Sequence, residues 1–109
     1  MLDHVTEASF DAEVIASATP VLVEFGATWC PPCRMIEPVL EAVAAERAGS
    51  LRVVSVDVDA QPGLQMRYGA LSVPTLLLFV GGRPVRHAVG YRPKNALLRL
   101  VDEALAEAA

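Results

Sequence analysis

Two cysteines are the residues of this chain whose type and spacing most directly indicate chemistry. Cys30 and Cys33, the only cysteines of the 109-residue sequence, are separated by Pro31 and Pro32. A single close pair cannot form a disulfide framework, and in a reducing compartment a C-x-x-C pair is more often catalytic or metal-binding than structural. The pair is therefore predicted to be either a redox centre or part of a metal site.

A strand is predicted to end, and a helix to begin, at these cysteines. Residues 21–26 are apolar without alternation, the pattern of a central strand that is covered on both faces. Residues 32–48 have helical periodicity, and prolines are well tolerated in a first helical turn. Cys30 would then lie at the positive end of the helix, where C-x-x-C thiols have a pKa lowered from about 8.5 towards 7. We expect Cys30 to attack a disulfide and Cys33 to close a bond with it.

A carboxylate stands inside the apolar strand. Glu24 has Val23 and Phe25 as neighbours, and burial between such residues raises the pKa of a carboxyl group, so that it exchanges protons near neutral pH. The alternative is a solvent-facing glutamate on an edge strand, which is the usual situation of this residue. We predict a buried Glu24 that can accept or donate a proton near neutral pH.

A zinc site and a structural disulfide are the alternatives for the cysteine pair. Structural zinc takes four ligands, and outside the pair the sequence offers only His4 and His87 in unrelated segments, with no second C-x-x-C. A short pair at a helix start is reducible, unlike an inert structural disulfide. We therefore expect a redox pair and no metal.

The remaining elements follow from hydrophobic periodicity and from the positions of Gly and Pro. After a short first strand we expect a helix over residues 8–17, with Thr6 as its cap, and strands over residues 51–58, 75–80 and 84–89. A short helix is expected over residues 59–69 and a closing helix over residues 93–108. Gly81-Gly82 should form a hairpin turn between the last two strands. The order βαβαβαββα predicts an α/β fold with a mixed five-stranded sheet flanked by four helices. Residues 1–109 have the size of one domain.

Composition excludes some classes of partner. The net charge is −4, from nine basic and thirteen acidic residues, and provides no basic stripe for nucleic acid. No window reaches the roughly 18 uninterrupted apolar residues of a membrane span. The first residues, Met1 to His4, have no basic and apolar leader pattern. We expect a cytoplasmic protein, unless a leader has been removed, and a monomer.

Four short segments together resemble the thioredoxin family over nearly the whole chain: Val23-Glu24-Phe25, Trp29-Cys30-Pro31-Pro32-Cys33-Arg34, Val73-Pro74-Thr75 and Val89-Gly90. The resemblance implies a thioredoxin fold and the reduction of protein disulfides through Cys30 and Cys33. It also implies that no cofactor is bound and that electrons come from NADPH through a flavoprotein, thioredoxin reductase. The other partners implied are disulfide-containing client proteins.

The same resemblance implies roles for individual residues. Glu24 would take the proton of Cys33 through a water molecule, and the peptide bond before Pro74 would be cis, so that the Val73 backbone can pair with a substrate strand. An apolar substrate surface is expected around Cys30, formed by Trp29, Val58, Val73, Pro74, Gly90 and Tyr91.

Leu71 and Tyr91 replace smaller or more polar residues of the family near the expected substrate surface, and three further residues depart from the family pattern. Pro31 replaces a glycine, which removes one N–H near the sulfur, and we expect Pro31 and Pro32 to tune the reduction potential. Gly26 stands in place of a tryptophan, which would leave Asp59 without its usual partner. Ser55 stands in place of a lysine, so the pKa of Glu24 is expected to be higher than where that positive charge is present.

Two other functions remain open at this point. The glutamate and the altered dipeptide are also compatible with the same fold acting as a disulfide oxidase or isomerase. A non-catalytic binding module with incidental cysteines is the second alternative.

Overall fold

Strands and helices follow one another in the predicted order βαβαβαββα. The computed structural model describes residues 2–108. The elements are β1 (Asp3–His4), η1 (Asp11–Ile15), β2 (Val21–Gly26), α1 (Pro31–Glu46), β3 (Arg52–Asp57), α2 (Pro62–Tyr68), β4 (Thr75–Val80), β5 (Arg83–Val89) and α3 (Lys94–Ala108).

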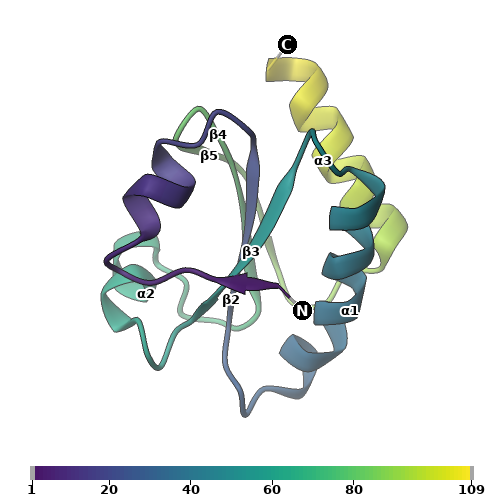
Figure 1. The fold of residues 1–109 in the computed structure, drawn as a ribbon. Coiled ribbons are helices and arrows are strands. Elements are labelled where there is room, and N and C mark those ends of the chain that lie inside the picture. Colours follow the sequence, from purple (N-terminus) through teal and green to yellow (C-terminus); the bar gives the residue numbers. More distant parts are fainter. Residues whose placement is uncertain (1, 109) are drawn as a thin grey trace.

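The five strands form one mixed sheet in the order β1-β3-β2-β4-β5. The β3 strand pairs in parallel with both β1 and β2, whereas β4 runs antiparallel to β2 and β5. Helices α1 and α3 cover one face of the sheet, and η1 and α2 cover the other (Figure 1). The predicted mixed five-stranded sheet, flanked within residues 2–108 by four helices, is confirmed.

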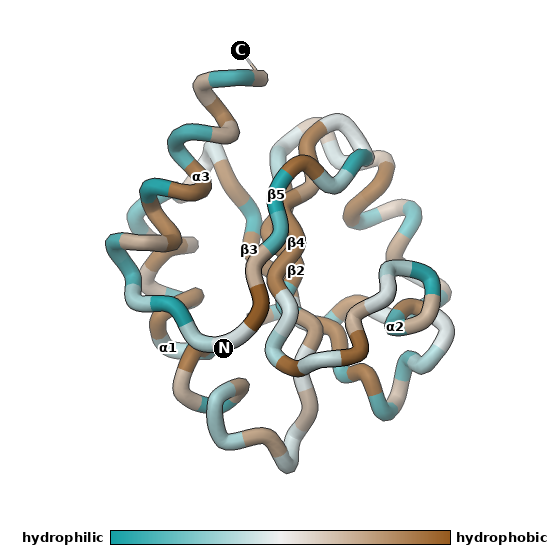
Figure 2. The backbone as a smooth tube through the Cα atoms, turned by 180° about the vertical axis from the view of Figure 1, so that it is seen from behind, coloured by the Kyte–Doolittle hydropathy of each residue, from teal (hydrophilic) through white to brown (hydrophobic). Residues whose placement is uncertain are grey.

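Strand β2 divides the interior into two cores because its side chains alternate between the faces of the sheet. Val21, Val23 and Phe25 pack under η1 and α2, whereas Leu22 packs under α1 and α3. The backbone in Figure 2 is accordingly hydrophobic along the central strands and alternates in hydropathy along α1 and α3. By the same alternation Glu24 projects towards the face that α1 covers.

The β4–β5 hairpin has the predicted two-residue turn. Gly81 has φ 60° and Gly82 has φ 81°, so both adopt the left-handed conformation that tight hairpin turns require and that glycine accepts most readily. Strand β5 begins at Arg83, directly after the turn.

The first helix is shorter than the predicted 8–17. Thr6 caps only the turn before the helix, where its Oγ1 accepts the Ser9 N–H at 3.2 Å. The capping position of η1 itself is Phe10, which makes no side-chain capping bond, so the prediction that Thr6 caps this helix is wrong. The helix then widens, because the Ala16 N–H donates to the carbonyl of Asp11, five residues earlier, at 2.8 Å. A wide turn of this kind is rare and is seldom continued.

Within the described residues, no helix is long and apolar enough to cross a bilayer.

Candidate active site

The cysteine pair occupies the amino end of α1. Cys30 is the capping residue, with an extended backbone (φ −94°, ψ 110°), and Pro31 and Pro32 fill the first two helical positions. The Cys33 N–H donates to Cys30 Sγ at 3.2 Å, and the two residues are joined by a disulfide across a Cα–Cα distance of 5.3 Å. The orientation of the helix and this amide would stabilise a negative charge on Cys30 Sγ in the reduced protein.

The loop before β4 lies beside Cys30 and is joined to the end of β5. The Val73–Pro74 peptide bond is cis, as the resemblance implies, and the carbonyl oxygen of Val73 lies 3.8 Å from Cys30 Sγ. The Gly90 N–H donates to the carbonyl of Pro74 at 2.8 Å, which ties the end of β5 to the loop before β4. The backbone of Val73 is therefore held beside the sulfur, and the end of β5 is bonded to the same loop.

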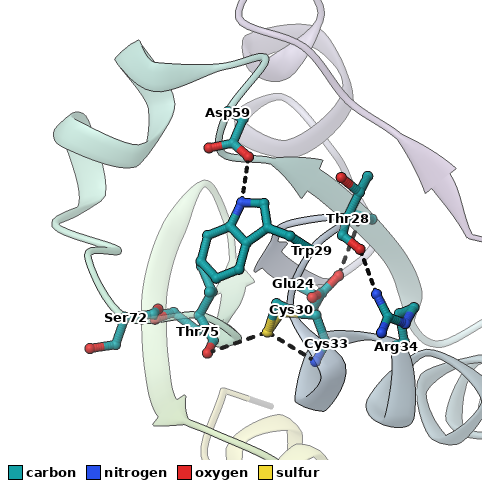
Figure 3. The surroundings of a disulfide bond; sticks show 11 residues. Glu24, Thr28, Trp29, Cys30, Cys33, Arg34, Asp59, Ser72 and Thr75 are labelled. Carbon is teal, nitrogen blue, oxygen red and sulfur yellow. Dashed lines mark hydrogen bonds between the residues drawn. A yellow bond between two sulfur atoms is a disulfide. The ribbon is translucent and has the colours of Figure 1, made fainter.

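Trp29 lies on the surface next to the pair. Its side chain is 64% exposed, and its Nε1–H donates to Asp59 Oδ2 at 2.7 Å (Figure 3). Asp59 lacks a tryptophan partner at position 26, as expected, but the indole of Trp29 reaches over to this carboxylate in its place. Asp59 thus fixes the orientation of the exposed ring beside Cys30.

The other residues of the predicted substrate surface differ in burial. Tyr91 is exposed, and Val73 and Gly90 are half-buried, so these residues are open to a partner. Val58 is 3% exposed and packs in the core under η1 and α2, so its side chain lies beneath this surface rather than on it. Leu71, which is 79% exposed, adds an apolar side chain two residues before Val73.

Glu24 is buried, as its apolar neighbours predict. The residue is 4% exposed, and Ser55, its register partner on β3, donates its hydroxyl to Glu24 Oε1 at 3.2 Å. Burial raises the pKa of Glu24 to about 7, while the hydrogen bond from Ser55 opposes the rise and the negative charge of Glu37 adds to it. The group is therefore half-ionised near neutral pH.

A cleft of about 300 Å³ connects the carboxyl group of Glu24 to Cys33. It lies between the first turns of α1 and the adjoining strands, and its lining includes His4, Glu24, Gly26, Cys33, Glu37 and Ser55. Neither His4 nor Glu37 is among the site residues predicted from the sequence. The strand pairing supplies a signal for His4, since His4, Ser55 and Glu24 are successive register partners across β1, β3 and β2.

Arg34 closes the loop that carries the pair. Its Nη1 donates to the carbonyl of Thr28 at 2.7 Å, which links the chain on either side of the two cysteines (Figure 3). Among residues 2–108, no group of three or more His, Cys, Asp or Glu side chains is arranged to hold a metal ion.

The site has a cysteine sulfur at a helix start, a second sulfur bonded to it and a buried carboxyl group nearby. These features define the class of C-x-x-C thiol–disulfide oxidoreductases. The family model Thioredoxin matches residues 1–103. A thioredoxin of Mycobacterium tuberculosis is 50% identical over 99 residues, which cover 91% of this chain and 85% of the relative. A thioredoxin of Streptomyces clavuligerus is 46% identical over 99 residues, covering 91% and 92%.

A longer relative combines two named activities. The "Bifunctional thioredoxin reductase/thioredoxin" of Mycobacterium leprae is 50% identical over 96 residues, and the match covers 88% of this chain but 21% of that protein. Taken together, these similarities show that the chain belongs to the thioredoxin family. It has the thioredoxin fold, and with its Cys30–Cys33 disulfide it is a thiol–disulfide oxidoreductase.

Proposed function

We propose that this chain reduces the disulfides of client proteins and that Cys30 makes the first attack. The observation that carries the proposal is the position of Cys30 as the cap of α1, with the Cys33 N–H directed at its sulfur. The Cys30 thiolate bonds to one client sulfur, and the client's S–S bond breaks. The second client sulfur leaves as a thiolate and takes a proton from solvent.

Glu24 serves the second step as a proton acceptor. It takes the proton of the Cys33 thiol, through a water molecule, and the Cys33 thiolate attacks Cys30 Sγ. The mixed disulfide breaks, the client leaves with two more electrons, and the Cys30–Cys33 disulfide remains. Support comes from the shared cleft of Glu24 and Cys33 and from a pKa of Glu24 of about 7, which suits a base at neutral pH.

The client binds as an extended segment beside the pair. The backbone of Val73, turned by the cis bond to Pro74, pairs with the segment, while Trp29 and Tyr91 provide apolar contacts and Gly90 leaves room for close approach. Val58 supports this surface from below. Pro31 and Pro32 act on the potential of the pair, Pro31 through the N–H that it lacks.

Substitution of each cysteine tests the order of attack. We expect Cys30→Ser to abolish the reduction of insulin disulfides, whereas Cys33→Ser accumulates a mixed disulfide with the substrate. Multiple turnover that persists without Cys30 would contradict the catalytic proposal and would favour a binding module with incidental cysteines.

The proton acceptor has a separate test. We expect Glu24→Gln to slow release of the mixed disulfide by about a hundredfold or more, a typical contribution of a positioned base, and to slow the first attack much less. Rapid-mixing experiments resolve the two steps. Equal slowing of both steps would argue against a base that acts on Cys33.

A disulfide oxidase or isomerase is the second candidate, because Glu24 and Pro31 are also compatible with these activities. Equilibration with glutathione decides between the two. For a reductase, the reduction potential of the Cys30–Cys33 pair is expected at about −270 mV. A potential of about −180 mV, typical of protein disulfide isomerase, would favour the second candidate.

We infer that NADPH supplies the electrons through a flavoprotein thioredoxin reductase. The support is the Mycobacterium leprae relative, whose name joins a thioredoxin reductase to a thioredoxin in one protein. NADPH consumption by a thioredoxin reductase, with insulin as acceptor, should then depend on this chain. A cytoplasmic monomer is the corresponding expectation, and cell fractionation and light scattering check it.

A further inference from the structure

The carboxyl group of Glu24 occupies the space that a side chain at position 26 would need. A Cβ atom built on Gly26 would lie 2.1 Å from Glu24 Oε2 and 3.0 Å from its Cδ. Gly26 is absent from the glycines with positive φ, so its backbone conformation is one that any residue adopts. The glycine is therefore needed for space and not for conformation.

The contact follows from the strand. Glu24 and Gly26 are two residues apart on β2 and so share a face of the sheet, and both line the cleft together with Cys33. The hydroxyl of Ser55 engages Oε1, which leaves Oε2 directed towards Gly26. The carboxyl group thus leans towards the carboxyl end of β2, the end from which the chain continues to the cysteines.

We propose that Gly26 is a positioning residue, whose missing side chain lets the Glu24 carboxyl group lie in the cleft on the side of Cys33. The effect of Gly26 on turnover rests on the proposed role of Glu24 as proton acceptor. The placement of the carboxyl group does not, because it follows from the contact alone.

A second glycine of the chain provides a matched control. A Cβ atom on Gly63 would lie 2.7 Å from Glu7 Oε2, so Gly63→Ala also displaces the end of a glutamate. That carboxylate accepts the Gly63 N–H at 2.6 Å, and neither residue lines the cleft. Any general effect of such a collision should therefore appear in Gly63→Ala as well.

The test begins with Gly26→Ala. The new methyl group must push the carboxyl group away by about 1 Å or more to reach ordinary contact, and only the flexible end of a side chain has to move. A displacement of this size is expected to slow release of the mixed disulfide by about tenfold or more. The titration midpoint of the Glu24 carboxyl, followed by carbon NMR, should also move. Gly63→Ala should leave both quantities unchanged.

A double-mutant cycle separates positioning from general damage. Glu24→Asp shortens the side chain by one methylene, so that its carboxyl group no longer reaches over position 26. In the Glu24→Asp background we expect Gly26→Ala to change the release rate by less than about twofold, because coupling appears only between residues in contact. Equal costs in both backgrounds would overturn the proposal.

The outcomes distinguish this inference from the function on which it rests. If Gly26→Ala moves the midpoint but not the release rate, positioning stands and the role of Glu24 as acceptor fails. If neither changes while Glu24→Gln still slows release, positioning fails and the acceptor role stands. Folding of the double variant but not of Gly26→Ala would support the collision, and misfolding of both would overturn it.

Discussion

The carboxyl group of Glu24 is held between opposing demands. Burial makes its ionised form costly, and the nearby charge of Glu37 acts in the same direction, whereas the hydroxyl of Ser55 stabilises the ion. A neutral side chain would be more favourable for folding alone at pH above neutrality. This cost is consistent with the proposed role of Glu24 as proton acceptor, and it should make the stability of the protein depend on pH.

Glu24→Gln should remove a pH dependence of the free energy of unfolding. The pKa of Glu24 is about 7 in the folded protein and 4.5 as its ordinary value. Because the folded value is the higher one, its stabilising contribution is complete below pH 4.5 and is lost as the pH rises through 7. The loss amounts to about 3 kcal/mol.

Guanidinium unfolding of the oxidised protein at a series of pH values measures this effect. Relative to the wild type, Glu24→Gln should gain stability between pH 5 and 8, by about the predicted loss. The same substitution at the exposed Glu103 is the control. If the free energy of unfolding changed with pH in the same way in the wild type and in Glu24→Gln, the raised pKa of a buried Glu24 would be contradicted.

Among the elements, the β4–β5 hairpin shows how local sequence fixes tertiary structure. Gly81 and Gly82 are adjacent and both have positive φ, but their surroundings differ. A Cβ atom on Gly81 would meet nothing within 4 Å, whereas one on Gly82 would lie 2.7 Å from the backbone oxygen of Ile15. The turn is therefore in contact with the end of η1 as well as being the link between two strands.

The two glycines should respond differently to alanine. Gly81→Ala carries only the cost of a left-handed alanine, about 1 kcal/mol. Gly82→Ala adds a collision with backbone, which cannot rotate away, and should lose more, about 2–3 kcal/mol. Thermal and denaturant unfolding measure both. Equal losses would show that the contact with Ile15 does not restrict the turn.

At the scale of the whole molecule, the sheet brings together residues from distant parts of the sequence. Strands 21–26 and 75–80 were predicted to the residue, because buried apolar runs end sharply at Gly and Pro. The helix start at the cysteines was predicted from the two prolines. Helix ends were less certain, as in η1, where one wide turn stopped a longer periodic pattern.

The rest of the site could not be predicted from local pattern. Only about 5–6% of the peptide bonds before proline are cis in folded proteins, so the cis bond before Pro74 could be predicted from the family resemblance alone. The cleft depends on the register of β1 against β3 and on the rotation of α1, which brings Glu37 over Glu24. The bond from Trp29 to Asp59 depends on where two loops meet.

Which sulfur attacks first is the central question for the whole molecule. Cys30 is 3% and Cys33 is 6% exposed, so exposure does not identify the nucleophile. The proposal that Cys30 attacks first rests instead on its capping position, which provides the Cys33 N–H and the positive end of α1. Cys33 instead faces the cleft that it shares with Glu24.

The most direct measurement is alkylation of the reduced protein with iodoacetamide over a range of pH, with the labelled cysteine identified by peptide mass. We predict that Cys30 is labelled first and that its rate reaches half of its maximum below about pH 8.5, the value of an ordinary thiol. First labelling of Cys33, or a Cys30 midpoint above about pH 9, would contradict this account.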